Sequence, residues 1–223
     1  MSDRPGRRLA VLMGDLVASR AAPSAERLHA AFNAGIATFN ADHGAALVSP
    51  LTITLGDEFQ GLVRSLGEAF ALMHAMRLHF MDEGVACRFV LGAATVETEI
   101  NPERAWNMMG RGLSEARELL NDKDDPNAYR FSLPAAPLLQ ASLNTHGYTM
   151  TYVEELWTDT QRAYFSKALR RRDTTYVELA EAIGVSVRNL HNVLRAGHRE
   201  LYERQLETIR PALATLDATP AAP

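Results

Sequence analysis

Two aspartates follow glycines at positions where an extended segment ends or turns. Asp15 follows Gly14 after the apolar run at residues 9–13, and Asp57 follows Gly56 between two apolar segments. In a split β-α-β sheet the first strand lies beside the hairpin, so both carboxylates can face one spot. Close carboxylates repel, and Mg²⁺ relieves this by binding one or two of them together with substrate phosphates. The pair predicts a nucleotide-type site for Mg²⁺ or Mn²⁺; the simpler alternative is a turn at each Gly-Asp.

Side chains that suit phosphate oxygens lie near these acids in the sequence or in the expected fold. Ser19 and Arg20 come shortly after the first aspartate, and Arg111 and Arg117 are further candidates for nucleotide binding. Arginine offers a planar fork of donors that matches phosphate geometry. The alternative for the two later arginines is a structural ion pair with a nearby glutamate. Glu58 is expected on the opposite face of its strand, or as an acid that supports the metal ligands from behind.

The C-terminal third carries the pattern of two short helices that cross at a steep angle. Ala180 supplies a small residue where the helices cross, and Gly184 allows a turn with positive φ at no steric cost. Apolar positions seal the angle, namely Leu179, Ile183, Val185, Leu190 and Val193. Asp173 or Thr174 is expected to cap the first helix, and Ser186 the second. The pattern predicts a helix-turn-helix.

The second of these helices is predicted to bind DNA. It presents outward Ser186, Val187, Arg188, His191 and Asn192. Arginine and asparagine pair with guanine and adenine edges in the major groove. Arg170, Arg171, Arg172 and Arg195 flank the unit as phosphate contacts, and residues 160–210 hold ten Lys or Arg against six Asp or Glu. The alternatives are a protein-docking module and a solvated helix face.

The order of apolar patterns predicts an α+β fold. Helices are expected at residues 24–40, 68–81, 113–120 and 138–143, and strands at 8–17, 46–55, 58–63, 86–96 and 129–133. This order is that of a ferredoxin-like, split β-α-β layout. We expect an α/β domain at residues 1–150, an all-α domain with the helix-turn-helix at 151–213, and a disordered tail at 214–223.

Composition places the chain among ordinary globular proteins. It has 223 residues, of which 47% are hydrophobic and 22% charged. Its single cysteine, Cys87, excludes an internal disulfide, fits a reducing compartment and is expected to be a packed thiol. The apolar run after the basic start is too short for a signal or a membrane span. A cytoplasmic protein without a membrane partner is the expectation.

Three segments together resemble the bacterial SatD family: residues 13–20, 54–62 and 88–94. The resemblance covers nearly the whole chain, including the predicted helix-turn-helix. The N-terminal part is also similar to class III nucleotidyl cyclases and, more distantly, to GGDEF catalytic domains. This similarity implies that Asp15 and Asp57 bind two Mg²⁺ ions, with the main-chain carbonyl of Leu16 as a further ligand.

The same similarity shows where the chain departs from active cyclases. Cyclases that use ATP usually carry a lysine where Ile53 stands here. Ser114 replaces the transition-state asparagine, and the arginine falls one residue early at Arg117, with Glu118 in its place. Loss of one preorganised hydrogen-bond donor to the transition state lowers the catalytic rate by a factor of about 10²–10³. These departures favour sensing of a nucleotide over its turnover.

Three functions remain open from the sequence. The first is a transcription regulator whose cyclase-like domain binds a nucleotide with Mg²⁺ and biases the geometry of a DNA-binding helix-turn-helix. The second is an active nucleotidyl cyclase or related nucleotidyltransferase. The third is a DNA-binding dimer whose α/β domain binds no ligand. A homodimer is expected because a two-fold operator mirrors a two-fold protein, and because the cyclases that the chain resembles form their sites across a dimer interface.

Overall fold

A mixed sheet forms the centre of the protein in the computed structural model, which describes residues 8–17, 24–54, 56–171 and 174–219. Its strand order is β2-β3-β1-β4-β5, and β6 pairs with β4. The strands are β1 (Arg8–Leu16), β2 (Leu47–Ile53), β3 (Glu58–Val63), β4 (Cys87–Val96), β5 (Gly110–Arg111) and β6 (Tyr129–Ser132). β3 and β4 flank β1 as antiparallel neighbours, and β6 is parallel to β4. The order β2-β3-β1-β4 is the split β-α-β arrangement that the sequence predicts.

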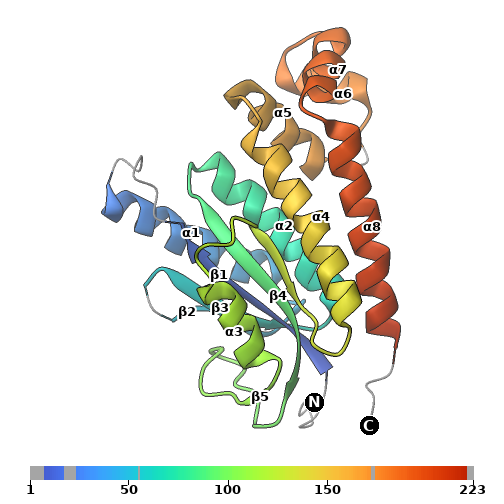
Figure 1. Cartoon of the computed structure of the whole chain (residues 1–223). Coiled ribbons are helices and arrows are strands. Elements are labelled where there is room, and N and C mark those ends of the chain that lie inside the picture. Colours follow the sequence, from blue (N-terminus) through green and yellow to red (C-terminus); the bar gives the residue numbers. More distant parts are fainter. Residues whose placement is uncertain (1–7, 18–23, 55, 172–173, 220–223) are drawn as a thin grey trace.

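Helices cover both faces of this sheet (Figure 1). The helices in the described ranges are α1 (Ala25–His43), α2 (Leu66–Asp82), α3 (Leu113–Asn121), α4 (Pro137–Glu155), α5 (Asp159–Arg170), α6 (Tyr176–Ile183), α7 (Val187–Ala196) and α8 (Arg199–Ala218). Of these, α5, α6 and α7 lie beyond the sheet. Side chains alternate along β1, so Ala10 and Leu12 join the larger core beneath α1 and α2, while Val11 and Met13 join a smaller core beneath α3. None of the helices in the described ranges is both long and apolar enough to cross a membrane.

α4 is much longer than the sequence predicts. A short helix is expected at residues 138–143, but α4 has 19 residues and packs against β6 and α8. It lies close to β6 because Gly147 has no side chain, and a Cβ there would collide with the carbonyl oxygen of Tyr129. The predicted length is wrong because the later apolar positions of α4 pack against helices distant in sequence. The division into domains at residue 150 falls inside α4 and stays a prediction.

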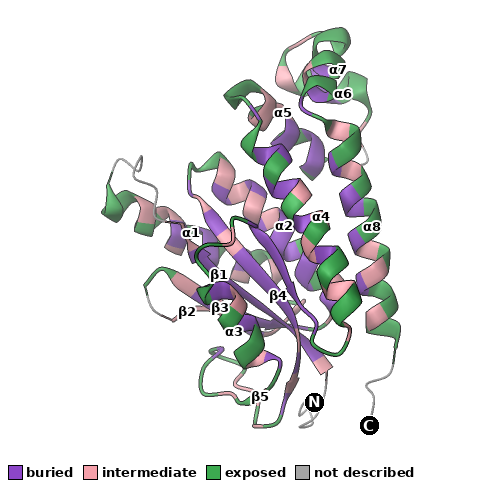
Figure 2. Cartoon of the chain, viewed as in Figure 1, coloured by how far each residue is buried: buried purple, intermediate pink, exposed green. Residues whose placement is uncertain are grey.

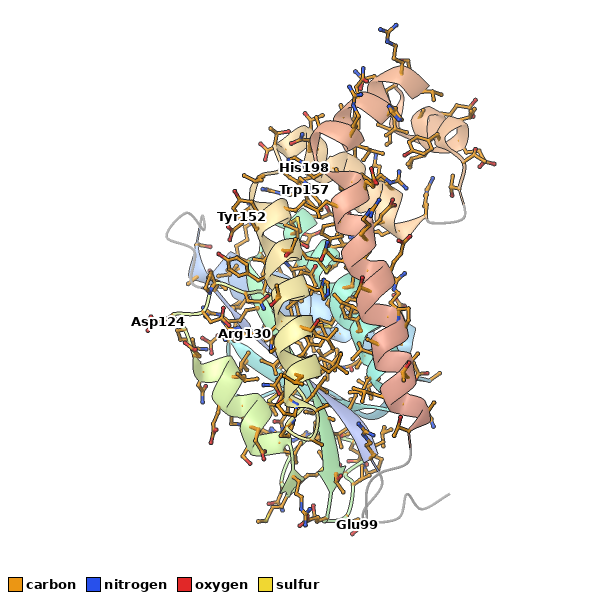
Figure 3. All side chains as sticks on the ribbon, turned by 45° about the vertical axis from the view of Figure 1, so that its right-hand side comes forward. Glu99, Asp124, Arg130, Tyr152, Trp157 and His198 are labelled. Atoms are coloured by element: carbon orange, nitrogen blue, oxygen red, sulfur yellow. The ribbon has the colours of Figure 1, made fainter. Side chains whose placement is uncertain are left out.

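The C-terminal helices share one hydrophobic core with the sheet. α4 and α8 run side by side next to α2 (Figure 1), and buried positions continue from the strands into them (Figure 2). The residues of α8 in this common core are Tyr202, Leu206, Ile209 and Leu213. Where α4 ends and α8 begins, the Trp157 indole N–H donates to the carbonyl oxygen of Gly197 at 2.9 Å (Figure 3). This contact joins the start of α8 to the end of α4.

A buried carboxylate, Glu154 of α4, lies inside this common core and is 2% exposed. Its Oε1 accepts hydrogen bonds from the hydroxyls of Tyr129 at 2.6 Å and Tyr202 at 2.7 Å. Its Oε2 accepts a hydrogen bond from Nε of Arg77 at 2.8 Å. We call these four residues the Glu154 cluster. They connect α2, α4, α8 and β6 through one charged group.

The interior fixes the protonation of the Glu154 cluster. Burial, and then the charge of Glu154, raise the pKa of Tyr129 and Tyr202 well above the usual value, so both hydroxyls stay protonated and can donate. Burial alone would lower the pKa of Arg77, but the adjacent Glu154 raises it above the usual value. The cluster therefore sets the guanidinium group of Arg77 against the carboxylate of Glu154 at 2.8 Å, which avoids an isolated charge in the core.

A three-residue turn joins α6 and α7. Gly184 ends α6 with a φ of +83°, the left-handed conformation that the sequence predicts. Ser186 caps α7, as expected, by accepting a hydrogen bond from the backbone N–H of Asn189 at 3.2 Å. The two helices pack against each other.

The cap of α6 differs from the prediction. Thr175 caps this helix, and its own backbone N–H donates to the carboxylate of Glu178 at 2.8 Å. Thr174 is therefore not the cap, because the glutamate that completes the reciprocal pair must stand three residues after the capping residue. Asp173, the other expected cap, lies outside the described residues.

We expect Glu154→Gln to lower the free energy of unfolding by about 3–5 kcal/mol, because it keeps the shape of the side chain but removes the counter-ion of the largely buried Arg77. Urea unfolding followed by circular dichroism measures this. The matched control is Glu155→Gln, which changes an exposed neighbour and should stay within about 0.5 kcal/mol of the wild type. Equal stabilities of the two variants would contradict the role given to Glu154.

Candidate functional site

Charged side chains gather on the α3 face of the sheet at the end of β1. Asp15 pairs in register with Glu58 on β3 and with Arg88 on β4, and directly paired residues share a face. By alternation along β1, this is the face of Val11 and Met13. The expectation that Glu58 lies on the opposite face is wrong, because the strand register places it beside Asp15.

Asp15 is buried between two cations. It is 2% exposed. Nε of Arg88 lies 3.1 Å from its Oδ1, and the ammonium group of Lys123 contacts its Oδ2. The Arg88 pair lacks hydrogen-bond alignment, so Asp15 Oδ1 and Arg88 Nε are both buried without a hydrogen-bond partner. A buried carboxylate oxygen in this state is open to a further donor or to a cation.

A buried arginine holds Lys123 in place. Arg130 on β6 is 1% exposed, and the chain after α3 wraps around its guanidinium group. Arg130 donates hydrogen bonds to the main-chain carbonyls of Leu119, Asp122, Asp125 and Asn127. Figure 3 shows Arg130 beneath this loop and Asp124 at its outer edge. The loop therefore presents Lys123 to Asp15 from a fixed frame.

Asp57 and Leu16, the other predicted metal ligands, meet at the backbone. The N–H of Leu16 donates to the carbonyl oxygen of Asp57 at 2.9 Å, and Asp57 is exposed in the hairpin turn. Within the part of the chain that the structure describes, no three His, Cys, Asp or Glu residues gather as a metal-binding group. Asp15, Leu16 and Asp57 thus lie close together along the backbone, and carboxylate and carbonyl oxygens are the donors that a hard cation prefers.

Arg117 is the predicted phosphate-binding residue that the structure brings into this site. Its Nη2 donates to Oε1 of Gln60 at 2.5 Å, and its Nη1 lies 3.5 Å from Oε2 of Glu58. Gln60 also donates through its amide to the carbonyl oxygen of Ala105. Arg117 thus reaches from α3 to two side chains of β3.

The other predicted nucleotide-binding residues are not brought into the site. Arg111 lies in β5, which pairs with β4 at Thr95 and Val96, the opposite end from Arg88. Its side chain is 90% exposed and lies 3.7 Å from Glu97. The placement expected for Arg111 is wrong because β5 continues the sheet away from Asp15. Ser19 and Arg20 lie outside the described residues.

Four residues of the site were not predicted: Gln60, Arg88, Lys123 and Arg130. Two carried a readable signal, since Gln60 alternates with Glu58 on one strand and Arg88 interrupts the apolar start of another. Lys123 lies in an acidic, Pro-containing loop with no periodic pattern. Its role depends on the contact with Asp15, which is 108 residues away in sequence, and on the hydrogen bonds by which its loop packs on Arg130.

A second group of candidate residues lies on α7. Val187, Arg188, His191 and Asn192 are all exposed on this helix, and the outer face of α7 is mostly exposed in Figure 2. Ser186, also predicted to bind DNA, uses its side-chain oxygen to accept the hydrogen bond that caps α7. Four predicted DNA-binding side chains therefore lie exposed on one short helix, and the ring of His191 also contacts that of Tyr176 on α6.

The arginines before α6 do not act as one group. Arg170 donates to Oδ2 of Asp82 on α2 at 2.7 Å, and the hydroxyl of Ser166 donates to the same oxygen at 2.5 Å. The charge of Arg170 is thus already paired within the protein. Arg171 is exposed at the end of α5. Arg172 lies outside the described residues.

The comparisons with known proteins support the resemblance to the SatD family. The SatD family matches residues 9–211. No curated protein matches the chain. A crystal structure of the guanylyl cyclase Cya2 is similar, with 15% identity, a TM-score of 0.36 and coverage of 52% of this chain and 71% of that one. The structure of a bacterial light-regulated adenylyl cyclase is similar as well, with 12% identity, a TM-score of 0.39 and coverage of 60% of this chain and 79% of that one. With both TM-scores below 0.5, the fold rests on the strand order alone.

We expect the thiol of Cys87 to be unreactive in the native protein. It is buried, and burial raises its pKa well above the usual value, so the nucleophilic thiolate is scarce. Modification by iodoacetamide, followed by mass spectrometry, should be slower by about a hundredfold or more than in the urea-unfolded protein, because only opened molecules react. Similar rates in both states would show that this strand is accessible.

Proposed function

This chain belongs to the SatD family, and we propose that it is a regulator in which a nucleotide bound with Mg²⁺ at Asp15 adjusts DNA binding by α7. The observation that carries this proposal is the buried Asp15 carboxylate, which keeps one oxygen without a hydrogen-bond partner between the cations Arg88 and Lys123. The buried carboxylate is suited to a metal cation, and the two basic side chains beside it are suited to the phosphates that the metal carries.

The residues of this chain divide between the two parts of such a ligand. Asp15, Asp57 and the Leu16 carbonyl would hold Mg²⁺, which supplies charge that neutralises phosphate oxygens. Lys123 is 48% exposed at its side chain and contacts the buried Asp15 carboxylate. Its ammonium group can turn to a phosphate oxygen when a metal takes its place at Asp15. Arg88 remains as a fixed positive charge beneath the ligand.

The geometry favours binding over turnover. Stabilising a transferring phosphoryl group requires preorganised donors aimed at it. Arg117 is instead engaged with Gln60 and Glu58, and the Ser114 hydroxyl donates to Glu115 at 3.1 Å. Ser114, at the position of the transition-state asparagine, and Arg117, one residue before that of the arginine, are thus both engaged in contacts within the protein. An active cyclase remains the alternative function.

DNA binding is proposed for α7 because its exposed face combines a cation with hydrogen-bonding side chains. Arg188 and Asn192 are exposed and lie one turn apart, and Gly184 sets the angle between α7 and α6. Arg195 is also exposed, at the end of the same helix. These features support insertion of α7 into a major groove.

A route for coupling is available through the Glu154 cluster. Nη1 of Arg77 donates to the carbonyl oxygen of Cys87 at 2.8 Å, next to Arg88 in the site. Arg77 also pairs with Glu154, which binds Tyr202 on α8. α8 follows α7 directly and contacts it. A shift of β4 at the site therefore has a chain of polar contacts to the proposed DNA-binding helices.

We expect nucleotide with Mg²⁺ to raise the melting temperature. Ligand at a hundredfold excess over its Kd stabilises by about 2.7 kcal/mol, which corresponds to roughly 5–10 °C for a chain of this size. Asp15→Asn combined with Asp57→Asn should abolish the shift, whereas the exposed Asp42→Asn on α1 should keep it. Differential scanning fluorimetry with ATP, GTP and their diphosphates measures this.

Two results would argue against the nucleotide proposal. An unchanged melting curve for the wild type across the nucleotide panel would exclude a ligand of this class. A shift that survives in the double variant would place the ligand elsewhere. Chromatography of the same mixtures tests the alternative function, since a cyclic or oligomeric product would show that the chain is an active cyclase or nucleotidyltransferase.

We expect the protein to bind duplex DNA with a steep salt dependence, because phosphate contacts release counterions. Fluorescence anisotropy with duplexes enriched from a random pool measures the affinity. Arg188→Ala should weaken binding by about 1–3 kcal/mol, while Arg27→Ala, an exposed arginine on α1, should not. Equal affinities of the two variants would exclude α7 as the reading helix. If the affinity for DNA does not change when nucleotide and Mg²⁺ are added, the function that remains is a DNA-binding dimer whose α/β domain binds no ligand.

A further inference from the structure

A cavity of about 280 Å³ opens on the α3 face of the sheet, next to the Asp15 site. Its floor is formed by Val11, Met13 and Leu62, all at most 1% exposed. Its rim holds polar side chains, namely Gln60, Ser114 and Arg117. The volume is below the range of about 300–1,000 Å³ that accepts drug-sized ligands. The cavity therefore suits a single flat ring system with a polar edge.

The cavity and the Asp15 site lie in line along two strands. Met13 is two residues before Asp15 on β1, and Gln60 is two residues after Glu58 on β3. Two residues of a strand span about 7 Å, and both pairs face α3. The cavity and Asp15 are thus separated by about the length of a sugar, and Arg117 spans this interval through its contacts with Gln60 and Glu58.

The polar rim is held by hydrogen bonds rather than left free to rotate. Oε1 of Gln60 accepts from Arg117, and its amide N–H donates to the carbonyl oxygen of Ala105. The loop that carries Ala105 is itself tied to β2, since the Ala105 N–H donates to the Thr52 hydroxyl oxygen at 2.9 Å. The amide and the guanidinium group are thus presented at the cavity in a fixed orientation.

We propose that this cavity binds the purine base of the nucleotide whose phosphates lie at Asp15. The inference rests on the proposed function and adds the class of base to it. Glutamine and arginine side chains pair with the N7 edge of adenine and guanine, an edge that pyrimidines lack. The second amide hydrogen of Gln60 and the remaining donors of Arg117 meet this edge, while the ring covers the apolar floor.

Nucleosides without phosphates test this site separately from Asp15. Saturation-transfer NMR on the full chain in EDTA, with adenosine, guanosine, cytidine and uridine in turn, should show transfer to purine protons above that to pyrimidine protons. Gln60→Leu should weaken purine binding about threefold to tenfold, the usual worth of one hydrogen bond. Ser114→Phe places a bulky ring in the cavity and should abolish the signal.

Glu118→Phe is the matched control, because it adds the same ring at an exposed position one turn further along α3. The inference is overturned if no purine nucleoside gives a signal, or if Ser114→Phe and Glu118→Phe bind alike. Nucleosides carry no phosphate and the assay contains no metal, so failure of the Asp15 proposal leaves this result unchanged. If purine nucleosides bind but nucleotide with Mg²⁺ does not raise the melting temperature, the cavity is still a purine site and the metal site at Asp15 is rejected.

Discussion

The Glu154 carboxylate accepts hydrogen bonds from two tyrosines and an arginine in the middle of the protein. An unpaired charge at that depth would be strongly destabilising, so the four side chains can only be buried together. Each partner comes from a different element: Arg77 from α2, Tyr129 from β6 and Tyr202 from α8. The relative positions of the sheet and the C-terminal helices therefore depend on this one anion being satisfied.

The hydrogen bonds of Arg77, a member of the Glu154 cluster, also position part of the candidate site. Arg77 binds the carbonyl oxygen of Cys87, which fixes the strand from which Arg88 approaches Asp15. On the other side, the guanidinium group of Arg130 gathers the loop that carries Lys123. Arg77, which is largely buried, and Arg130, which is fully buried, thus set the positions of the two cations beside Asp15. Positive charge near Asp15 is a property of the packing rather than of one motif.

Local patterns predicted much of the fold. The strand ending at Asp15, the hairpin and the Gly184 turn follow from apolar alternation and from glycine at a position of positive φ, both of which depend on near neighbours. α4 was predicted too short because its second half packs against α8, about 50 residues later in the sequence. The cap of α6 was predicted at the wrong residue because several Thr and Asp candidates stand together and Glu178 selects among them.

Asp15 is the feature that the sequence by itself determined, because an acid after Gly14 at the end of an apolar strand is a local signal. The sequence also determined that α6 and α7 meet at Gly184, since helix caps and turn residues act over a few positions. Only the tertiary structure decided what surrounds Asp15. Glu58 and Arg88 are beside it through strand register, and Lys123 through a loop folded on Arg130. Strand register and the contact of Lys123 with Asp15 join residues that are distant in sequence, which a pattern along the chain does not specify.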